Sequence, residues 1–288
     1  MITIEKMLKN WLDVYIKPCR AQKTIICYST TIKLIKIHAP DFKKTPISDV
    51  QELDIQRLIN SLSGSYSKST LRKIRTVLHE AYNASIRNNE CTVNPANSIT
   101  IPRNASEKKV RALTQEEQKQ VEIAAETDKL GAIVIFFLYT GLRAAELCNL
   151  KWCDYDEREN IIYIRESKTP AGRRKIPLLP KAKKMIEIQP KISNYIFTST
   201  TGKPVTQTVL QKLSYRMRRA TGINWITTHV YRHSFATRLV EQGVDYRALA
   251  TLLGHTDVAF TLQRYTNADD DFLKEQIFLL DSKHKQPE

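Results

Sequence analysis

The chain has 288 residues, of which 42% are hydrophobic, so it is long enough for two domains of ordinary size with apolar cores. A formal net charge of +15 indicates a polyanionic partner, and nucleic acid is the first expectation. The longest apolar run, Ala132 to Tyr139, is far shorter than the roughly 20 residues that cross a bilayer. The opening residues lack a signal-peptide pattern, so we expect no membrane segment and no membrane partner.

The five cysteines argue against a zinc site. They are scattered and form no C-x-x-C pair, a distribution typical of a reducing compartment. We therefore expect a cytoplasmic protein without a zinc ribbon. The cysteines are Cys19, Cys27, Cys91, Cys148 and Cys153.

Residues 1 to about 100 are predicted to be helical. Apolar residues at helical spacing indicate a first helix from Ile4, a second over Ile25–Ile35 and a third over Leu53–Leu62. A fourth and longer helix is predicted over Thr70–Arg87, with Ser69 as its N-cap.

A basic face of the fourth helix is a candidate for DNA contacts. Arg72, Lys73 and Arg75 lie off its apolar stripe, where they can reach a phosphate backbone. An ordinary solvated face remains the alternative.

The segment after the fourth helix predicts a domain boundary. Asn94-Pro95 and Ile101-Pro102 break helix, and Thr114 to Glu117 form a capping box that opens the next helix. We predict a helical DNA-binding domain over 1–104, a linker over 105–113, a second domain over 114–268, and a tail with a helix over 269–288.

The second domain is predicted to combine helices with a short hairpin. Gly131 to Thr140 forms an apolar, buried helix that Gly141 ends, and Arg143 opens the next helical segment. Ile161–Ile164 and Arg173–Leu178 are predicted strands, joined by a turn at Thr169–Gly172. The fold class is therefore mainly α with a small antiparallel β-sheet (α+β).

The densest positive charge follows this turn. Residues 171–220 contain 12 basic residues and one acidic residue, which favours a surface that faces DNA. Weaker candidates for DNA contacts are Arg173, Arg174, Lys212 and Arg216.

Three short motifs contain the side chains needed to attack a phosphodiester. They are Thr140-Gly141-Leu142-Arg143 with Glu146-Leu147, His229-x-x-Arg232-His-Ser-Phe-Ala-Thr, and Leu252-Leu253-Gly254-His255, which Tyr265 follows. Arginines can neutralise a phosphate and its transition state, while a tyrosine can become the covalent carrier. Glu146 is expected to orient its neighbours by hydrogen bonding, and Tyr231 to pack in the core.

These motifs, in this order and with Lys168 between the first two, resemble the tyrosine recombinase or phage-integrase family. The resemblance implies a site-specific DNA recombinase that cuts and rejoins double-stranded DNA through a 3′-phosphotyrosine intermediate, for integration or excision of a mobile element or recombination at two specific sites. It implies no metal and no cofactor. The implied catalytic residues are Arg143 and Arg232 on the phosphate, Lys168 as general acid, His229 as base, His255 on the phosphate and Tyr265 as nucleophile.

The resemblance also implies an assembly. A homotetramer on two DNA sites is expected, with accessory DNA-bending proteins as further partners and a bacterial, archaeal or phage source. The tail helix, Phe272 to Leu280, packs either on its own domain or on a neighbouring protomer, and the second arrangement is favoured. Two alternatives to a recombinase stay open: a type IB topoisomerase that relaxes DNA, and a DNA-binding protein without chemistry.

Overall fold

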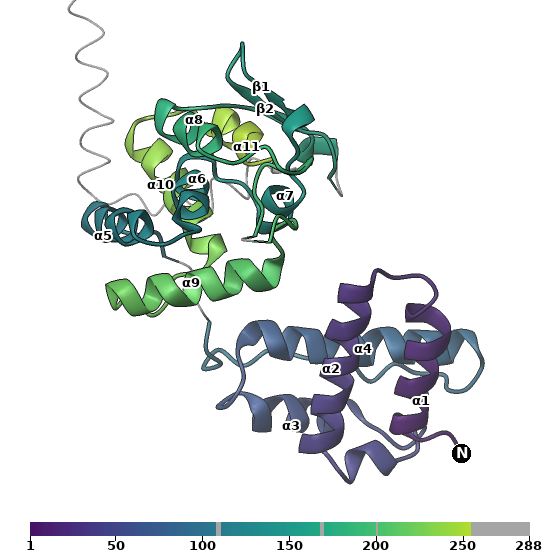
Figure 1. The fold of residues 1–288 in the computed structure, drawn as a ribbon. Helices are drawn as coiled ribbons and strands as arrows, with labels where there is room; N and C mark the ends of the chain where they lie inside the picture. The colour runs from purple at the N-terminus through teal and green to yellow at the C-terminus, as the bar shows by residue number, and fades with distance from the viewer. Residues whose placement is uncertain (108–110, 168–169, 200, 255–288) are drawn as a thin grey trace, which may run out of the picture. The chain divides into compact units, whose positions relative to one another are not determined.

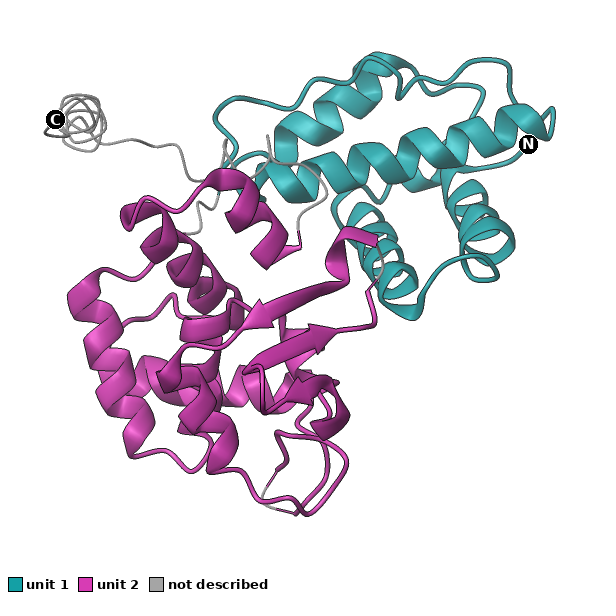
Figure 2. Ribbon diagram, turned by 90° about the horizontal axis from the view of Figure 1, so that it is seen from above, with its two compact units in different colours: residues 1–109 teal, residues 110–288 magenta. Residues whose placement is uncertain are grey.

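The computed structural model describes residues 1–107, 111–167, 170–199 and 201–254 (Figure 1). The chain divides into two compact units, residues 1–109 and residues 110–288, which Figure 2 colours separately. The described residues are mainly helical and include one small antiparallel sheet, which confirms the predicted fold class.

Unit 1 is helical, and α4 lies at its centre. Its apolar stripe, which includes Leu71, Ile74 and Val77, is fully buried against α1, α2 and α3. The elements of the unit are α1 (Ile4–Asn10), the π-helix η1 (Trp11–Ile16), α2 (Gln22–His38), the 3-10 helix η2 (Phe42–Lys44), α3 (Glu52–Leu62) and α4 (Lys68–Arg87).

The start of α4 differs from the prediction. Ser67, and not Ser69, is the N-cap, because its hydroxyl accepts a hydrogen bond from the backbone N–H of Thr70 at 3.4 Å. The helix therefore begins two residues earlier than predicted, and the assignment of Ser69 was wrong.

Unit 2 is organised around α6, whose side chains are apolar on all faces. Phe136 and Phe137 are fully buried, and α5, α8 and α10 pack around the helix, as Figure 1 shows. The helices are α5 (Gln115–Glu126), α6 (Gly131–Thr140), α7 (Ala144–Cys148), the 3-10 helices η3 (Trp152–Asp154) and η4 (Pro170–Gly172), α8 (Pro180–Glu187), α9 (Gln207–Thr221), α10 (Thr228–Glu241) and α11 (Tyr246–Leu253).

The sheet of unit 2 has the strand order β1-β2-β3, all antiparallel. The predicted hairpin is confirmed as β2 (Ile161–Ile164) paired with β3 (Arg174–Pro177), with Ile162 opposite Ile176. The short β1 (Tyr155–Asp156) was not predicted. Along β3, Arg174 and Ile176 are buried while Lys175 is exposed, so the side chain of Arg174 lies on the face that meets the core.

Within the described part of the chain, no helix combines the length and the apolar character needed to span a bilayer.

Candidate active site

The first motif forms a tight turn between α6 and α7. Gly141 caps α6 with a φ of 62°, and a Cβ atom there would lie 2.3 Å from Cδ1 of Phe235 on α10. This close passage brings Arg143, the N-cap residue of α7, beside α10. The side chain of Arg143 remains 39% exposed, so an external phosphate can reach its guanidinium.

Glu146 accepts hydrogen bonds from two arginines. Its carboxylate receives the backbone N–H of Arg143 at 2.8 Å and Nη1 of the same residue at 2.7 Å. Arg174 donates to both carboxylate oxygens at 2.9 Å in a bidentate pair. Burial acts to raise the pKa of Glu146, but the hydrogen bonds and charge of Arg174, with those of Arg143, outweigh it and lower the pKa to about 2. The hydrogen bonding to neighbouring residues predicted for Glu146 is confirmed.

The second motif lies on α10. The Thr227 hydroxyl accepts from the N–H of Val230 and caps the helix, so that His229, which is exposed, lies in the first turn. Arg232 follows one turn later and is 4% exposed. Its Nη1 donates to the Gly141 carbonyl at 2.8 Å and its Nη2 to the Leu253 carbonyl at 2.6 Å. Tyr231 is buried in the core, as predicted.

The third motif ends α11, and three arginines converge on its last carbonyls. Gly254 is the C-cap with a φ of 63°, as predicted for a helix that stops there. The acceptors and their donors are the Leu252 carbonyl with Arg174 Nε at 2.6 Å, the Leu253 carbonyl with Arg232 Nη2 at 2.6 Å, and the Gly254 carbonyl with Arg143 Nη2 at 2.8 Å. We call Arg143, Arg174 and Arg232 the arginine cluster. It joins all three motifs at one place.

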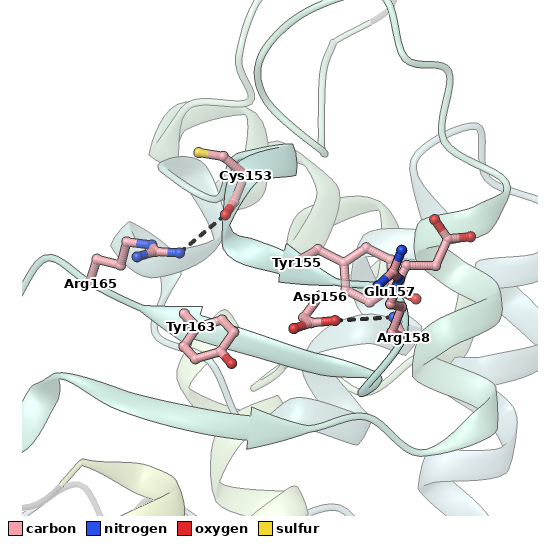
Figure 3. Close-up of a pocket in the computed structure, with 7 residues that line it drawn as sticks. All are labelled: Cys153, Tyr155, Asp156, Glu157, Arg158, Tyr163 and Arg165. Carbon is pink, nitrogen blue, oxygen red and sulfur yellow. Dashed lines mark hydrogen bonds between the residues drawn. The ribbon is translucent and has the colours of Figure 1, made fainter.

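A pocket of about 610 Å³ opens beside this cluster. Arg143 and Glu146 line it, and so does Ser167, the residue before Lys168. A second pocket of about 590 Å³ adjoins it at the β1–β2 end of the sheet, where Arg165 donates to the Cys153 carbonyl (Figure 3). Of the predicted catalytic residues that the structure describes, Arg143, His229 and Arg232, none lines this second pocket.

Six of the seven side chains predicted to contact DNA are exposed: Arg72, Lys73, Arg75, Arg173, Lys212 and Arg216. Arg75 also donates to the Ile99 carbonyl, and Arg216 forms a bidentate pair with Asp128. The seventh, Arg174, does not fit the prediction, because its side chain is only 2% exposed and is bonded within the fold. The observed alternation of buried and exposed residues along β3 separates Arg174 from Arg173 and Lys175, which are exposed.

Three of the predicted catalytic residues lie outside the described residues: Lys168, His255 and Tyr265. The predicted tail helix, Phe272 to Leu280, lies outside them as well. The described residues bring together Arg143 and Arg232, each bonded to the end of α11, and they place His229 on the same helix as Arg232. They contain no group of three or more His, Cys, Asp or Glu side chains that could hold a metal ion.

The family model for the phage integrase family matches residues 104–271. The chain belongs to this family. A protein of Caldanaerobacter subterraneus subsp. tengcongensis named "Tyrosine recombinase XerC-like" is 26% identical over 312 aligned positions, which cover 92% of this chain and 79% of that protein.

Solved structures of integrases share the fold. The Tn1549 transposon integrase, in complex with a circular intermediate DNA, superposes with a TM-score of 0.82 at 20% identity and covers 97% of this chain and 100% of that one. A lambda integrase tetramer bound to a Holliday junction superposes with a TM-score of 0.76 at 24% identity, covering 93% and 80% of the two chains.

Family and relatives agree on the activity. The chain is a tyrosine recombinase, a site-specific enzyme that joins DNA strands by transesterification. The names of these relatives support this over the topoisomerase-like and non-catalytic alternatives.

Proposed function

We propose that this recombinase cuts DNA through a 3′-phosphotyrosyl bond to Tyr265, with Arg143 and Arg232 binding the non-bridging oxygens of the scissile phosphate. The observation that carries the proposal is the convergence of the three motifs at the end of α11. Guanidinium groups stabilise a phosphorane-like transition state best when they are held in place beforehand. The partly exposed Arg143 meets that requirement, since Glu146 and the Gly254 carbonyl fix its orientation.

Proton transfer is assigned to the remaining residues. A free tyrosine has a pKa near 10, so Tyr265 needs a base, and His229 is our candidate because it is an exposed residue in the first turn of α10. Lys168 would protonate the leaving 5′-oxygen, and its neighbour Ser167 lines the pocket beside Arg143. His255 would hydrogen-bond the phosphate. In the sequence it follows Gly254, whose carbonyl accepts a hydrogen bond from Arg143.

The biological setting we propose is integration or excision of a mobile element, or recombination between two fixed sites, by a homotetramer on double-stranded DNA in the cytoplasm. The net charge of +15 favours the DNA partner. The related lambda integrase assembles as a tetramer on a Holliday junction, which supports the tetramer. DNA-bending proteins are further partners in this proposal.

The test is covalent trapping. DNA that stays bound to the expressed protein in denaturing detergent is recovered and sequenced, and a nicked duplex of that sequence serves as a suicide substrate. Wild-type protein should form a covalent adduct with this substrate that is sensitive to protease, and the peptide attached to the DNA should contain Tyr265. Tyr265→Phe should bind the duplex and form no adduct. Adduct formation by Tyr265→Phe would move the nucleophile elsewhere.

The role of Lys168 has its own control. The Lys168→Ala variant should cleave the ordinary substrate more slowly than wild type. It should cleave a 5′-bridging phosphorothiolate at the wild-type rate, because a thiolate leaves without protonation. Failure of the sulfur substrate to restore cleavage would remove Lys168 from the role of general acid.

A further inference from the structure

Arg174 is a buried member of the arginine cluster. It opens β3, and its side chain is 2% exposed, against 39% for Arg143. Its donors reach three places: the two oxygens of Glu146 at 2.9 Å, the Gly172 carbonyl at 3.0 Å and the Leu252 carbonyl at 2.6 Å. A guanidinium buried and bonded in this way has no route to a DNA phosphate outside the protein.

The contact between Arg174 and Arg143 is indirect and runs through Glu146. Each carboxylate oxygen accepts one hydrogen bond from each arginine. Arg174 of β3 therefore fixes the Glu146 carboxylate, and the same carboxylate fixes Arg143 at the start of α7. Because its four acceptor positions are used in this way, a shift of Arg174 alters the bonds that orient Arg143.

The second contact of Arg174 is with the end of α11. Carbonyl groups at a helix C-terminus have no partner within the helix and carry a partial negative charge, which a buried cation can balance. The fit is close, because a Cβ atom on Gly254 would lie 3.0 Å from Arg174 Nη1 and from the Ala171 carbonyl. Arg174 thus connects the hairpin of β2 and β3, the turn that carries Arg143, and the helix that ends just before His255.

We propose that Arg174 is a positioning residue for strand cleavage, which holds Arg143 and the end of α11 in register through Glu146 and the Leu252 carbonyl. The inference rests on the proposed function, since it assigns to Arg143 the task of binding the scissile phosphate. Arg174 itself touches neither DNA nor the reacting atoms. Lysine cannot replace it fully, because an ammonium group lacks the planar fork that pairs with two carboxylate oxygens at once.

The experiment compares duplex binding with adduct formation on the nicked suicide substrate for single-residue variants of the full chain. Arg174→Met should form the adduct roughly 100-fold more slowly, the size of effect that a small misplacement of a catalytic group produces. Its affinity for the same duplex should change little. Arg174→Lys should recover part of the rate, and Arg158→Met, which removes an exposed arginine from the β1–β2 turn, should leave both measurements unchanged.

A double variant separates positioning from misfolding. Glu146→Gln with Arg174→Met removes both charges of the buried pair, so no lone buried charge is left to unfold the protein. If the two residues act as one unit, the double variant should lose about as much rate as Arg174→Met alone. The inference would be overturned if the rate losses of Glu146→Gln and Arg174→Met multiplied in the double variant. It would also be overturned if Arg174→Met cleaved at the wild-type rate, or if it lost binding and cleavage equally. Absence of any adduct from wild-type protein and from Arg158→Met would instead contradict the proposed function.

Discussion

Among its described residues, unit 2 has two bidentate pairs between an arginine and a carboxylate, and they differ in burial. Arg174 and Glu146 have side chains that are 2% and 7% exposed. Arg216 on α9 pairs with Asp128 with N–O distances of 2.5 and 2.8 Å, but its side chain is 43% exposed. The geometry is alike, and only the first pair is desolvated. A buried charge depends on its partner, whereas water can replace the partner of an exposed one.

The difference in burial assigns the two pairs different roles. Arg174 is committed to contacts within the fold, where it fixes the position of Arg143 and the end of α11. Arg216 can exchange Asp128 for a phosphate at little cost, which keeps it available for the predicted DNA contact. The segment 171–220 therefore contains both a buried arginine bonded within the fold and an exposed one, which its sequence does not distinguish.

The largest expected effect is the loss of the buried partner. Arg174→Met should lower the free energy of unfolding by about 3–5 kcal/mol, as expected when a buried pair loses one member. Arg216→Met should lower it by about 0–1 kcal/mol, the usual range for an exposed pair. Urea unfolding followed by circular dichroism measures both, and equal losses would mean that burial does not distinguish the pairs.

The second prediction concerns pH. The pKa of Glu146 is lowered in the folded protein from 4.5 to about 2, so its contribution to stability is fully present above pH 4.5 and is lost as the pH falls toward 2. A shift of this size corresponds to about 3 kcal/mol. The stability difference between wild type and Glu146→Gln, measured from pH 6 downward, should shrink over that window. A difference that does not vary with pH would show that the carboxylate is not held ionised by the arginines.

The third prediction uses two glycines that cap helices with positive φ. Gly254→Ala and Gly222→Ala both place a Cβ atom in the left-handed region, at a cost of roughly 1 kcal/mol each. The added Cβ atom at position 254 would lie within 3.1 Å of Arg174 Nη1 and of two backbone atoms, whereas the one at position 222 would have nothing within 4 Å. Thermal unfolding should therefore show the larger loss for Gly254→Ala, and slower adduct formation for that variant alone. Equal behaviour would indicate that α11 does not depend on its contact with the hairpin.

The smallest expected effect is on DNA binding by Arg216. Arg216→Ala should reduce the slope of log affinity against log salt by about 0.9, the value for one lost phosphate contact. Arg174→Met should leave the slope unchanged. A filter-binding titration over a range of salt concentrations measures both, and a reduced slope for Arg174→Met would restore the original prediction that Arg174 contacts DNA.

Local features of unit 2 could be predicted from the sequence. Gly141 and Gly254 end their helices as expected, Thr114 and Glu117 form the predicted capping box, and β2 pairs with β3. These features depend on neighbouring residues, so the sequence displays them directly. The N-cap of α4 was misplaced because Ser67 and Ser69 are both acceptable caps, and packing of the helix decides between them.

The inner part of the site could not be predicted in the same way. The motifs identified Arg143 and Arg232, but the hydrogen bond between Arg174 and the Leu252 carbonyl joins residues 78 positions apart. Arg174 lies in a run of three basic residues. Its side chain is buried because the pairing register of β3 places it on the face toward the core. Such a contact follows from tertiary packing, which charge and spacing along the chain do not encode.

The most direct measurement of the central claim is adduct formation by Arg143→Ala, made together with its affinity for the same duplex. If Arg143 binds the scissile phosphate in the transition state, the cleavage rate should fall by about 10²–10³-fold, as for the loss of one preorganised donor. The affinity should change much less, because many other cations contact the backbone. Equal losses in rate and affinity would contradict the account, since Arg143 would then only help to hold the duplex.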